Sequence, residues 1–257
     1  MMTEYPLTKA NRIRLARAFR DNARVDLGID CAIEGQMGKV FTDEAAIPTA
    51  FRIEQGPFRY FAGDARSPGG REMIERLEPH TLLMSSPPEW PEVAEEIHRE
   101  KFISLSRYSF SSRRLSVVHV GHLLSESAFA GRIRKIDGAM ARAMREDPEI
   151  FLDLSCFDSA EDFVERGCGF FLEEGNEMIG AAWSSLVCSK GIEVSIYVVP
   201  AHRTRGVATA LACALLKHCL EQKIDPHWDA ANPESCTLAE KLGYVYMGSY
   251  DAYVLRE

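Results

Sequence analysis

The alternation of apolar and polar positions predicts an α/β protein with a mixed sheet and several helices. Apolar residues between positions 12 and 28 recur at helical spacing, and two runs flanking Gly56 alternate with the period of two that is typical of a β-hairpin. Regular strand and helix signals follow in the second half of the chain. We therefore predict a smaller α+β domain over 1–130 and a second domain over 131–257.

The second half carries the clearer start and stop signals. Ser159 is a predicted helix N-cap, and strands are expected on both sides of Gly175 and again from Ile192 to Val199. Asn232 followed by proline predicts the start of the last helix, and Gly243 predicts its end. An aromatic-rich strand or hairpin is expected to close the chain.

The first half gives weaker signals, and its topology stays open at this point. We predict a helix from Val93 to Phe102 and a strand near Val117. In that strand His119 and His122 would point to opposite faces, so they could not share a metal ion. Because the other histidines and cysteines also lack the spacing of a zinc site, we predict no bound metal.

Composition narrows the class of protein. Of the 257 residues, 46% are hydrophobic and 26% are charged, a composition typical of a soluble globular protein. A formal net charge of −8 argues against nucleic acid as the main partner. The seven scattered cysteines lack a Cys-x-x-Cys pair, and the chain shows neither a membrane-length apolar run nor a secretory signal. We therefore expect a cytoplasmic protein with no membrane partner.

The most informative segment is the predicted strand, turn and helix start from Ile192 to Leu211. Arg203, Gly206 and Ala208 form the spacing Arg-x-x-Gly-x-Ala at the start of the helix. Free amides and the positive end of the helix dipole favour an anion there, and glycine permits its close approach. The segment therefore predicts a pyrophosphate site, although a basic turn that merely begins a helix fits the spacing alone. It is neither a Walker loop nor a Rossmann fingerprint.

Together with later motifs, this segment resembles the GNAT N-acetyltransferase superfamily. The motifs of that superfamily appear here in order, over roughly 137–255: the strand with Glu193, the Val198-Val199-Pro200 exit, the basic loop, Asn232, and Leu238–Tyr244. A further likeness, to the subgroup that includes the zwittermicin A resistance acetyltransferase, is seen in HWDAANPES. In that subgroup a longer N-terminal region precedes the transferase domain. The helix-then-hairpin order of the first half suggests the hypothesis of a degenerate GNAT-like copy.

The resemblance implies that acetyl-CoA lies between two splayed parallel strands, Ile192–Val199 and Asp225–Ala231. His227 and Trp228 are neighbours on the second strand, so one would line the acceptor pocket and the other would fill the core. Backbone groups of the first strand would pair with the pantetheine arm, and the loop amides would hold the pyrophosphate. The implied coenzyme-binding residues are Val198, Val199, Arg203, Thr204, Arg205, Gly206, Val207, Ala208, Thr209, Asn232 and Ser235.

The resemblance also assigns the proton-transfer groups. Glu193 stands at the usual acidic position, seven residues before Pro200, and would be the general base, although a salt-bridged or edge glutamate is the alternative. Many relatives carry a tyrosine in the last helix that protonates the leaving thiolate, and here that position is Ala239. For the tyrosines nearby in sequence we expect packing roles: Tyr244, Tyr246, Tyr250 and Tyr253.

These observations predict an N-acetyltransferase that moves an acetyl group directly from acetyl-CoA to a primary amine of a small molecule. The first half would shape the acceptor pocket or cover its mouth. The main alternative is a CoA-binding regulatory module whose catalysis is lost, and turnover separates the two. An ATP-binding protein that uses the same loop is a third possibility, disfavoured because no magnesium-binding Asp and Lys pair is evident.

Overall fold

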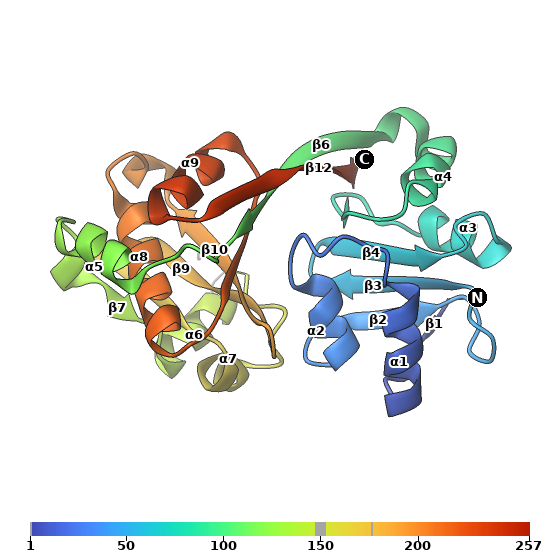
Figure 1. The fold of residues 1–257 in the computed structure, drawn as a ribbon, viewed down its shortest axis with the longest axis horizontal. Coiled ribbons are helices and arrows are strands. Elements are labelled where there is room, and N and C mark those ends of the chain that lie inside the picture. The colour runs from blue at the N-terminus through green and yellow to red at the C-terminus, as the bar shows by residue number, and fades with distance from the viewer. Residues whose placement is uncertain (1, 147–152, 176) are drawn as a thin grey trace. The chain divides into compact units, whose positions relative to one another are not determined.

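The computed structural model describes residues 2–146, 153–175 and 177–257, and Figure 1 shows their helices and strands. They form two compact units: Met1–Arg107 with Ser249–Glu257, and Tyr108–Gly248. The division thus falls before residue 108, whereas the sequence had suggested a division after residue 130. The reason is that two strands, β6 (Phe102–Ser111) and β12 (Val245–Leu255), each run through the division, so that no loop marks it.

The first unit follows the order of one α+β fold. Its elements are β1 (Thr3–Glu4), α1 (Lys9–Ala18), α2 (Gly28–Glu34), β2 (Lys39–Thr42), β3 (Ala50–Gln55), β4 (Phe58–Gly63), α3 (Pro68–Glu75), β5 (Leu82–Leu83), α4 (Glu89–His98) and the 3₁₀ turn Arg99–Lys101. Its strands lie in the order β1-β2-β3-β4-β5-β12. Neighbours are antiparallel except β4 and β5, which pair in parallel. The hairpin predicted around Gly56 is confirmed.

Helices cover both faces of this first sheet. Residues of β4 alternate between two apolar clusters, because successive side chains of a strand point to opposite faces. Tyr60 packs with Leu15 of α1 and Ile29 of α2, whereas Phe61 packs with Ile74 of α3 and the α4 residue Trp90. The Phe61 and Trp90 rings are stacked, with centroids 4.7 Å apart.

The second unit contains α5 (Val117–Ser125), β7 (Arg134–Lys135), α6 (Gly138–Glu146), α7 (Ala160–Arg166), β8 (Gly169–Glu174), β9 (Glu177–Cys188), β10 (Gly191–Val198), α8 (Val207–Glu221), β11 (Pro226–Ala230) and α9 (Pro233–Leu242), with short 3₁₀ turns at Ala130–Arg132 and Pro200–His202. Its strands lie in the order β7-β8-β9-β10-β11-β6, and the one parallel pair among the described registers is β10 with β11. From β7 onward the succession of helices and strands is the same as in the first unit (Figure 1). The first unit therefore repeats the topology of the second, as the hypothesis of a GNAT-like copy requires.

Most local signals of the second half are confirmed. Ser159 caps α7 through a bond from the Asp162 amide, and Asn232 caps α9. Gly243 ends α9 with a positive φ of 103°, a conformation that glycine adopts more readily than other residues.

The prediction of a strand near Val117 is wrong, because this segment forms helix α5. The Ser116 hydroxyl caps the helix, and the buried Val120 packs against Ala212 and Leu216 of α8. His119 and His122 therefore lie about one helical turn apart on α5. A ring nitrogen of His119 lies 2.9 Å from the Lys241 carbonyl oxygen. The helix predicted over Val93 to Phe102 exists but is displaced toward the N-terminus, as α4.

Two absences hold for the part of the chain that the structure describes. No group of three or more His, Cys, Asp or Glu side chains there could hold a metal ion. None of the helices in those ranges has both the length and the apolar character to cross a membrane.

Candidate functional site

The centre of the second unit is a pair of parallel strands that separate. β10 and β11 pair only at Ile192↔Pro226 and Glu193↔His227 in the described register. Beyond this point β11 pairs with β6, while β10 continues along β9 as far as Val198. At the same place the register of β10 against β9 shifts between Glu193 and Val194, which marks a β-bulge. The two strands thus enclose a wedge that begins at Glu193 and His227.

Backbone groups of β10 line one side of this wedge. The Val199 amide donates to the Ile179 carbonyl at 3.0 Å, so it faces β9 and not the wedge. The Val198 carbonyl accepts a bond of 3.1 Å from the Arg203 Nε. Because alternate residues of an antiparallel pair direct their N–H and C=O groups away from the partner, the Val198 amide and both backbone groups of Ile196 face the wedge. Ile196 was not among the residues that the sequence singled out.

The loop that leads into α8 presents backbone amides. Thr204 and Gly206 both have positive φ, 61° and 87°, which turns successive amides toward one side. Gly206 is the N-cap residue of this 15-residue helix, and no side chain caps it. The first amides of α8 therefore lack an intrahelical partner and lie at the positive end of the helix dipole. A Cβ built on Gly206 would meet no atom within 4 Å, which leaves space beside the loop.

Two cationic side chains, Arg205 and Lys241, lie near this helix start. Arg205 pairs with Glu174 at 3.3 Å and contacts the His202 ring at 2.8 Å. The hydrogen bond from Arg205 lowers the pKa of Glu174, which keeps that carboxylate ionised. Lys241 lies 3.5 Å from the Thr209 hydroxyl, so α9 contributes a second cation. Sequence reasoning included Lys241 in a motif but did not assign it to the site.

The far side of the wedge is fixed where α9 begins. The Asn232 carboxamide accepts a bond of 2.8 Å from the Ser235 amide, and the Ser235 hydroxyl accepts one of 3.2 Å from the Trp228 indole. Trp228 is buried in the core with α8 and α9, whereas its neighbour His227 is half-buried. Asn232 and Ser235 thus hold the helix start against β11 in this structure.

A carboxylate and an imidazole meet at the apex of the wedge. Glu193 is 8% exposed and forms the last parallel register pair with His227. The Nε2 atom of His227 lies 3.5 Å from a carboxylate oxygen of Asp225. Asp225 also accepts a hydrogen bond from the Ser112 hydroxyl. Groups that can accept and carry a proton therefore gather where the strands part.

No tyrosine occupies the expected acid position. Ala239 is fully buried in the core between α9 and its neighbours. Tyr244 is buried too, its hydroxyl donates to the Pro226 carbonyl at 2.9 Å, and burial raises its pKa well above 10.0. Tyr246 is exposed, and its ring packs edge-on against the Phe110 ring, with centroids 5.6 Å apart. These positions agree with packing roles.

The corresponding wedge of the first unit is closed. Its parallel strands pair at Phe58↔Leu82 and Arg59↔Leu83, so Arg59 holds the register position of Glu193. The buried Asn22 amide donates to the Phe61 carbonyl at 3.0 Å and lies 3.5 Å from the Ser85 carbonyl, which bridges the two strands. In addition, the Ser67 hydroxyl caps α3 by accepting from the Gly70 amide at 3.0 Å.

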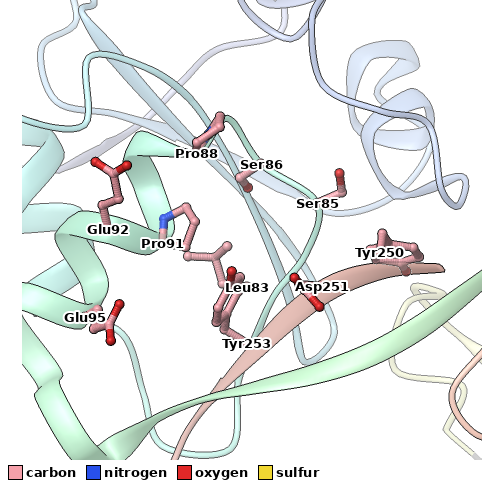
Figure 2. A pocket seen from close by; sticks show the side chains of 10 residues that line it. All are labelled: Leu83, Ser85, Ser86, Pro88, Pro91, Glu92, Glu95, Tyr250, Asp251 and Tyr253. Atoms are coloured by element: carbon pink, nitrogen blue, oxygen red, sulfur yellow. The ribbon is translucent and has the colours of Figure 1, made fainter.

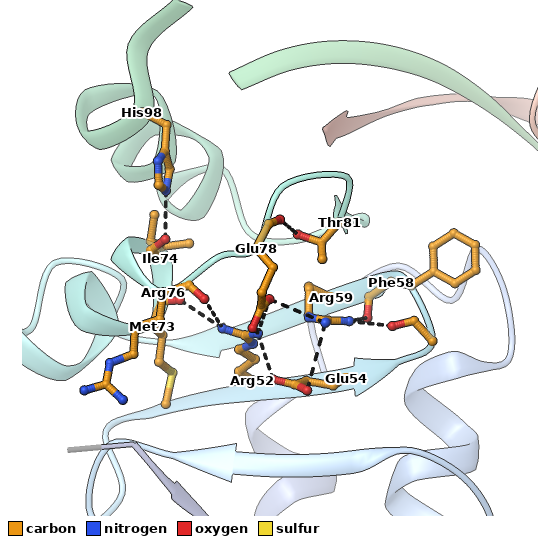
Figure 3. Close-up of polar contacts among 11 residues, drawn as sticks. Arg52, Glu54, Phe58, Arg59, Met73, Ile74, Arg76, Glu78, Thr81 and His98 are labelled. Carbon is orange, nitrogen blue, oxygen red and sulfur yellow. Dashed lines mark hydrogen bonds and ion pairs between the residues drawn. The ribbon is translucent and has the colours of Figure 1, made fainter. Parts of the chain in front are cut away.

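Charged side chains are paired inside the first unit (Figure 3). Arg52 is fully buried and pairs with Glu54 at 2.8 Å and Glu78 at 2.9 Å. Arg59 lies 3.5 Å from Glu78, and burial lowers the pKa of its guanidinium. The Arg52 guanidinium also donates to two carbonyls near the end of α3. This cluster joins the sheet to α3 and is structural.

A cavity of about 420 Å³ lies in the first unit, between α4 and β12. Figure 2 shows the side chains that line it. None of the residues predicted from the sequence to bind coenzyme or transfer protons lines it, although two of the tyrosines named there do. Its lining residues are Leu83, Ser85, Ser86, Pro88, Pro91, Glu92, Glu95, Tyr250, Asp251 and Tyr253.

Known proteins match this chain over both units. The sequence profile of the family described as GNAT acetyltransferase matches residues 23–253. A protein of Bacillus subtilis (strain 168) named as the uncharacterized N-acetyltransferase YdfB is 25% identical over 235 residues, which cover 84% of this chain and 85% of that protein.

Solved structures with the same fold cover nearly the whole chain. A GCN5-related N-acetyltransferase-like protein from Streptococcus suis 89/1591 has a TM-score of 0.84 at 24% identity, over 95% of this chain and 98% of its own. A tandem GNAT protein from the clavulanic acid biosynthesis pathway has a TM-score of 0.53 at 11% identity, over 99% and 96%. The likeness to a tandem protein agrees with the repeated topology of the two units.

Proposed function

The chain belongs to the GNAT acetyltransferase family, and we propose that it moves an acetyl group directly from acetyl-CoA to a primary amine of a small molecule. The observation that carries this proposal is the open wedge between β10 and β11 beside the uncapped start of α8. An extended pantetheine arm can add to the exposed edge of β10 as a strand would. The pyrophosphate can then occupy the helix N-terminus.

Residues around the wedge fit such a ligand. Amides from Gly206 to Thr209 would hold the pyrophosphate, and the cations Arg205 and Lys241 stand beside them. The Val198 amide and the backbone of Ile196 would pair with the arm. Arg203 would act indirectly, because its side chain holds the Val198 carbonyl and so fixes the loop.

Acetyl transfer needs a neutral amine, and we propose that Glu193 removes its proton. The amine nitrogen then attacks the thioester carbonyl carbon, a C–N bond forms, and the C–S bond breaks. The nitrogen loses its second proton, and the departing sulfur gains a proton, which gives an acetamide and the free thiol. Because Ala239 replaces tyrosine, no tyrosine of α9 supplies that proton.

The alanine at position 239, where many relatives carry the tyrosine acid, also favours a second candidate function, a CoA-binding regulatory module without turnover. In that case the loop and the wedge would bind coenzyme as above, and Glu193 would have no chemical role. Binding and turnover must therefore be measured separately.

The test of binding is isothermal titration with acetyl-CoA and with CoA. We expect micromolar affinity, abolished by Gly206→Glu, because a carboxylate would replace the phosphate at the helix start. A matched control is Gly248→Glu, since Gly248 also has a positive φ (135°) with no atom within 4 Å of its Cβ. Absence of binding by folded wild type would contradict the proposal.

The test of turnover is release of free thiol across a panel of small amines. We expect Glu193→Gln to lower kcat by about 10²-fold or more, with unchanged affinity for acetyl-CoA. If coenzyme binds and no amine is acetylated, the regulatory module is the better account.

A further inference from the structure

We propose that His227 carries the proton of the substrate amine from Glu193 to water, an inference that rests on the proposed acetyl transfer. The reason is a difference in exposure. Glu193 is 8% exposed, whereas the His227 side chain is 34% exposed. A buried base must discharge its proton before each new turnover, and a half-exposed imidazole beside it offers a route.

The sheet register places the two side chains together. Glu193 and His227 are partners in the parallel pair of β10 and β11, and laterally paired residues of neighbouring strands share a face of the sheet. Trp228, the next residue, points into the core with α8 and α9, so His227 faces the other side. Because this is the last pair before the strands separate, both side chains stand at the start of the wedge.

Asp225 fixes the orientation of the imidazole. One of its carboxylate oxygens lies 3.5 Å from His227 Nε2, and its other oxygen accepts from the Ser112 hydroxyl, which follows β6. This carboxylate, which the Ser112 hydroxyl holds in place, favours the tautomer with hydrogen on Nε2. The Nδ1 atom then remains the one that can accept a proton.

Charged and titratable groups near His227 come from β10, β11, the turn before β11, and Tyr244, whose hydroxyl donates to the carbonyl of the preceding residue, Pro226. Glu193 faces it from β10, Asp225 precedes it in the turn before β11, and Asp229 follows two residues later on the same face. The β6 residues in register with the next two positions of β11, Phe110 and Ser109, do not titrate.

The proton balance is as follows. The substrate ammonium gives one proton to the Glu193 carboxylate, which passes it to Nδ1 of His227. The imidazolium releases it to water or buffer, and both side chains return to their starting states. The second proton of the nitrogen is lost as the C–S bond breaks, and the sulfur leaves as the thiol. The overall reaction therefore releases one proton to solvent for each ammonium acetylated.

His227→Gln tests the inference through kcat, the pH profile and the effect of added imidazole. We expect kcat to fall about 10-fold or more, while the KM for acetyl-CoA stays within about twofold. Free imidazole buffer should restore a large part of the lost kcat in His227→Gln and have little effect on wild type. A purely structural role would not respond to buffer. Asp225→Asn should give a smaller loss in the same direction.

The matched control is His122→Gln, because His122 is an exposed histidine of α5 that pairs with Glu126 outside the wedge. It should behave as wild type at every pH. If wild type turns over, and His227→Gln keeps its kcat and pH profile without any response to imidazole, the inference is wrong and the acetyltransferase proposal stands. If wild type and His122→Gln bind coenzyme yet acetylate no amine, the proposed function fails and the inference fails with it.

Discussion

Replacing Gly206 with alanine separates the role of the loop from the stability of the fold. Gly206 has a φ of 87°, in a region that an alanine adopts at a cost of about 1 to 2 kcal/mol. A Cβ there meets no atom within 4 Å, so the cost arises from the backbone and not from a clash. The chain can relieve it by rotating the loop peptides, and this rotation turns the first amides of α8 away from their common direction.

The loss of binding can be worked out from those amides. A hydrogen bond from an amide to a charged phosphate contributes roughly 1.5 to 3 kcal/mol. Loss of one such bond therefore raises the Kd for acetyl-CoA about 10-fold or more, since about 1.4 kcal/mol corresponds to a factor of ten. Calorimetric titration at physiological ionic strength measures this change directly.

Gly243→Ala is the matched control. Gly243 also has a positive φ, 103°, and its Cβ would lie 3.7 Å from the His119 ring, an ordinary contact. Both variants should lose about 1 to 2 kcal/mol of unfolding free energy, visible as a lower Tm by differential scanning calorimetry. Only Gly206→Ala should lose affinity for the coenzyme. Equal affinities in the two variants, or an unchanged Kd in Gly206→Ala, would refute the proposed role of the loop.

Three further predictions concern stability and stoichiometry. Arg52→Ala should lower the unfolding free energy by about 2 to 5 kcal/mol in denaturant titrations, because it leaves a cavity at a fully buried site and removes the donors to two carbonyls near the end of α3; the exposed Arg66→Ala should cause no measurable change. Tyr244 stays protonated in the folded protein above pH 10.0 while the unfolded chain ionises, so this residue should make stability fall with rising pH by about 1.4 kcal/mol per unit, and Tyr244→Phe should make the fall less steep in unfolding titrations between about pH 9 and 12, although the buried Cys213 and Cys219, whose pKa values are also raised, keep part of it. Calorimetric titration should give one acetyl-CoA per chain, because Asn22 closes the wedge of the first unit; a stoichiometry of two would contradict this.

Structural features that depend on a few consecutive residues could be predicted from the sequence. The caps at Ser159 and Asn232 and the glycine stop at Gly243 are local, and the structure confirms them. The segment around Val117 misled the prediction because its valines favour strands. A serine cap and the packing of Val120 on α8 outweigh that preference.

Features that depend on distant pairing could not be predicted in the same way. The division before residue 108 arises because β6 and β12 each run through it, and no change of composition marks those places. The bond from Arg203 to the Val198 carbonyl joins the start of the loop to the end of β10, and the spacing of residue types in the sequence does not indicate it. The contact of Asn22 with Phe61 joins residues 39 positions apart, and neither residue type indicates it.

The two units show what one topology does with and without an open wedge. When two parallel strands separate, backbone groups along their edges lose their hydrogen-bond partners. The first amides of an uncapped helix likewise lack hydrogen-bond partners. In the first unit, Asn22 bridges the strands and Ser67 caps the helix, so the fold satisfies these groups itself. In the second unit, the helix after Gly206 has no side-chain cap, and β11 leaves the edge of β10 beyond Glu193. The fold can evidently close such a wedge with two polar side chains, so an open one in the same chain is best explained by a ligand that supplies the missing partners.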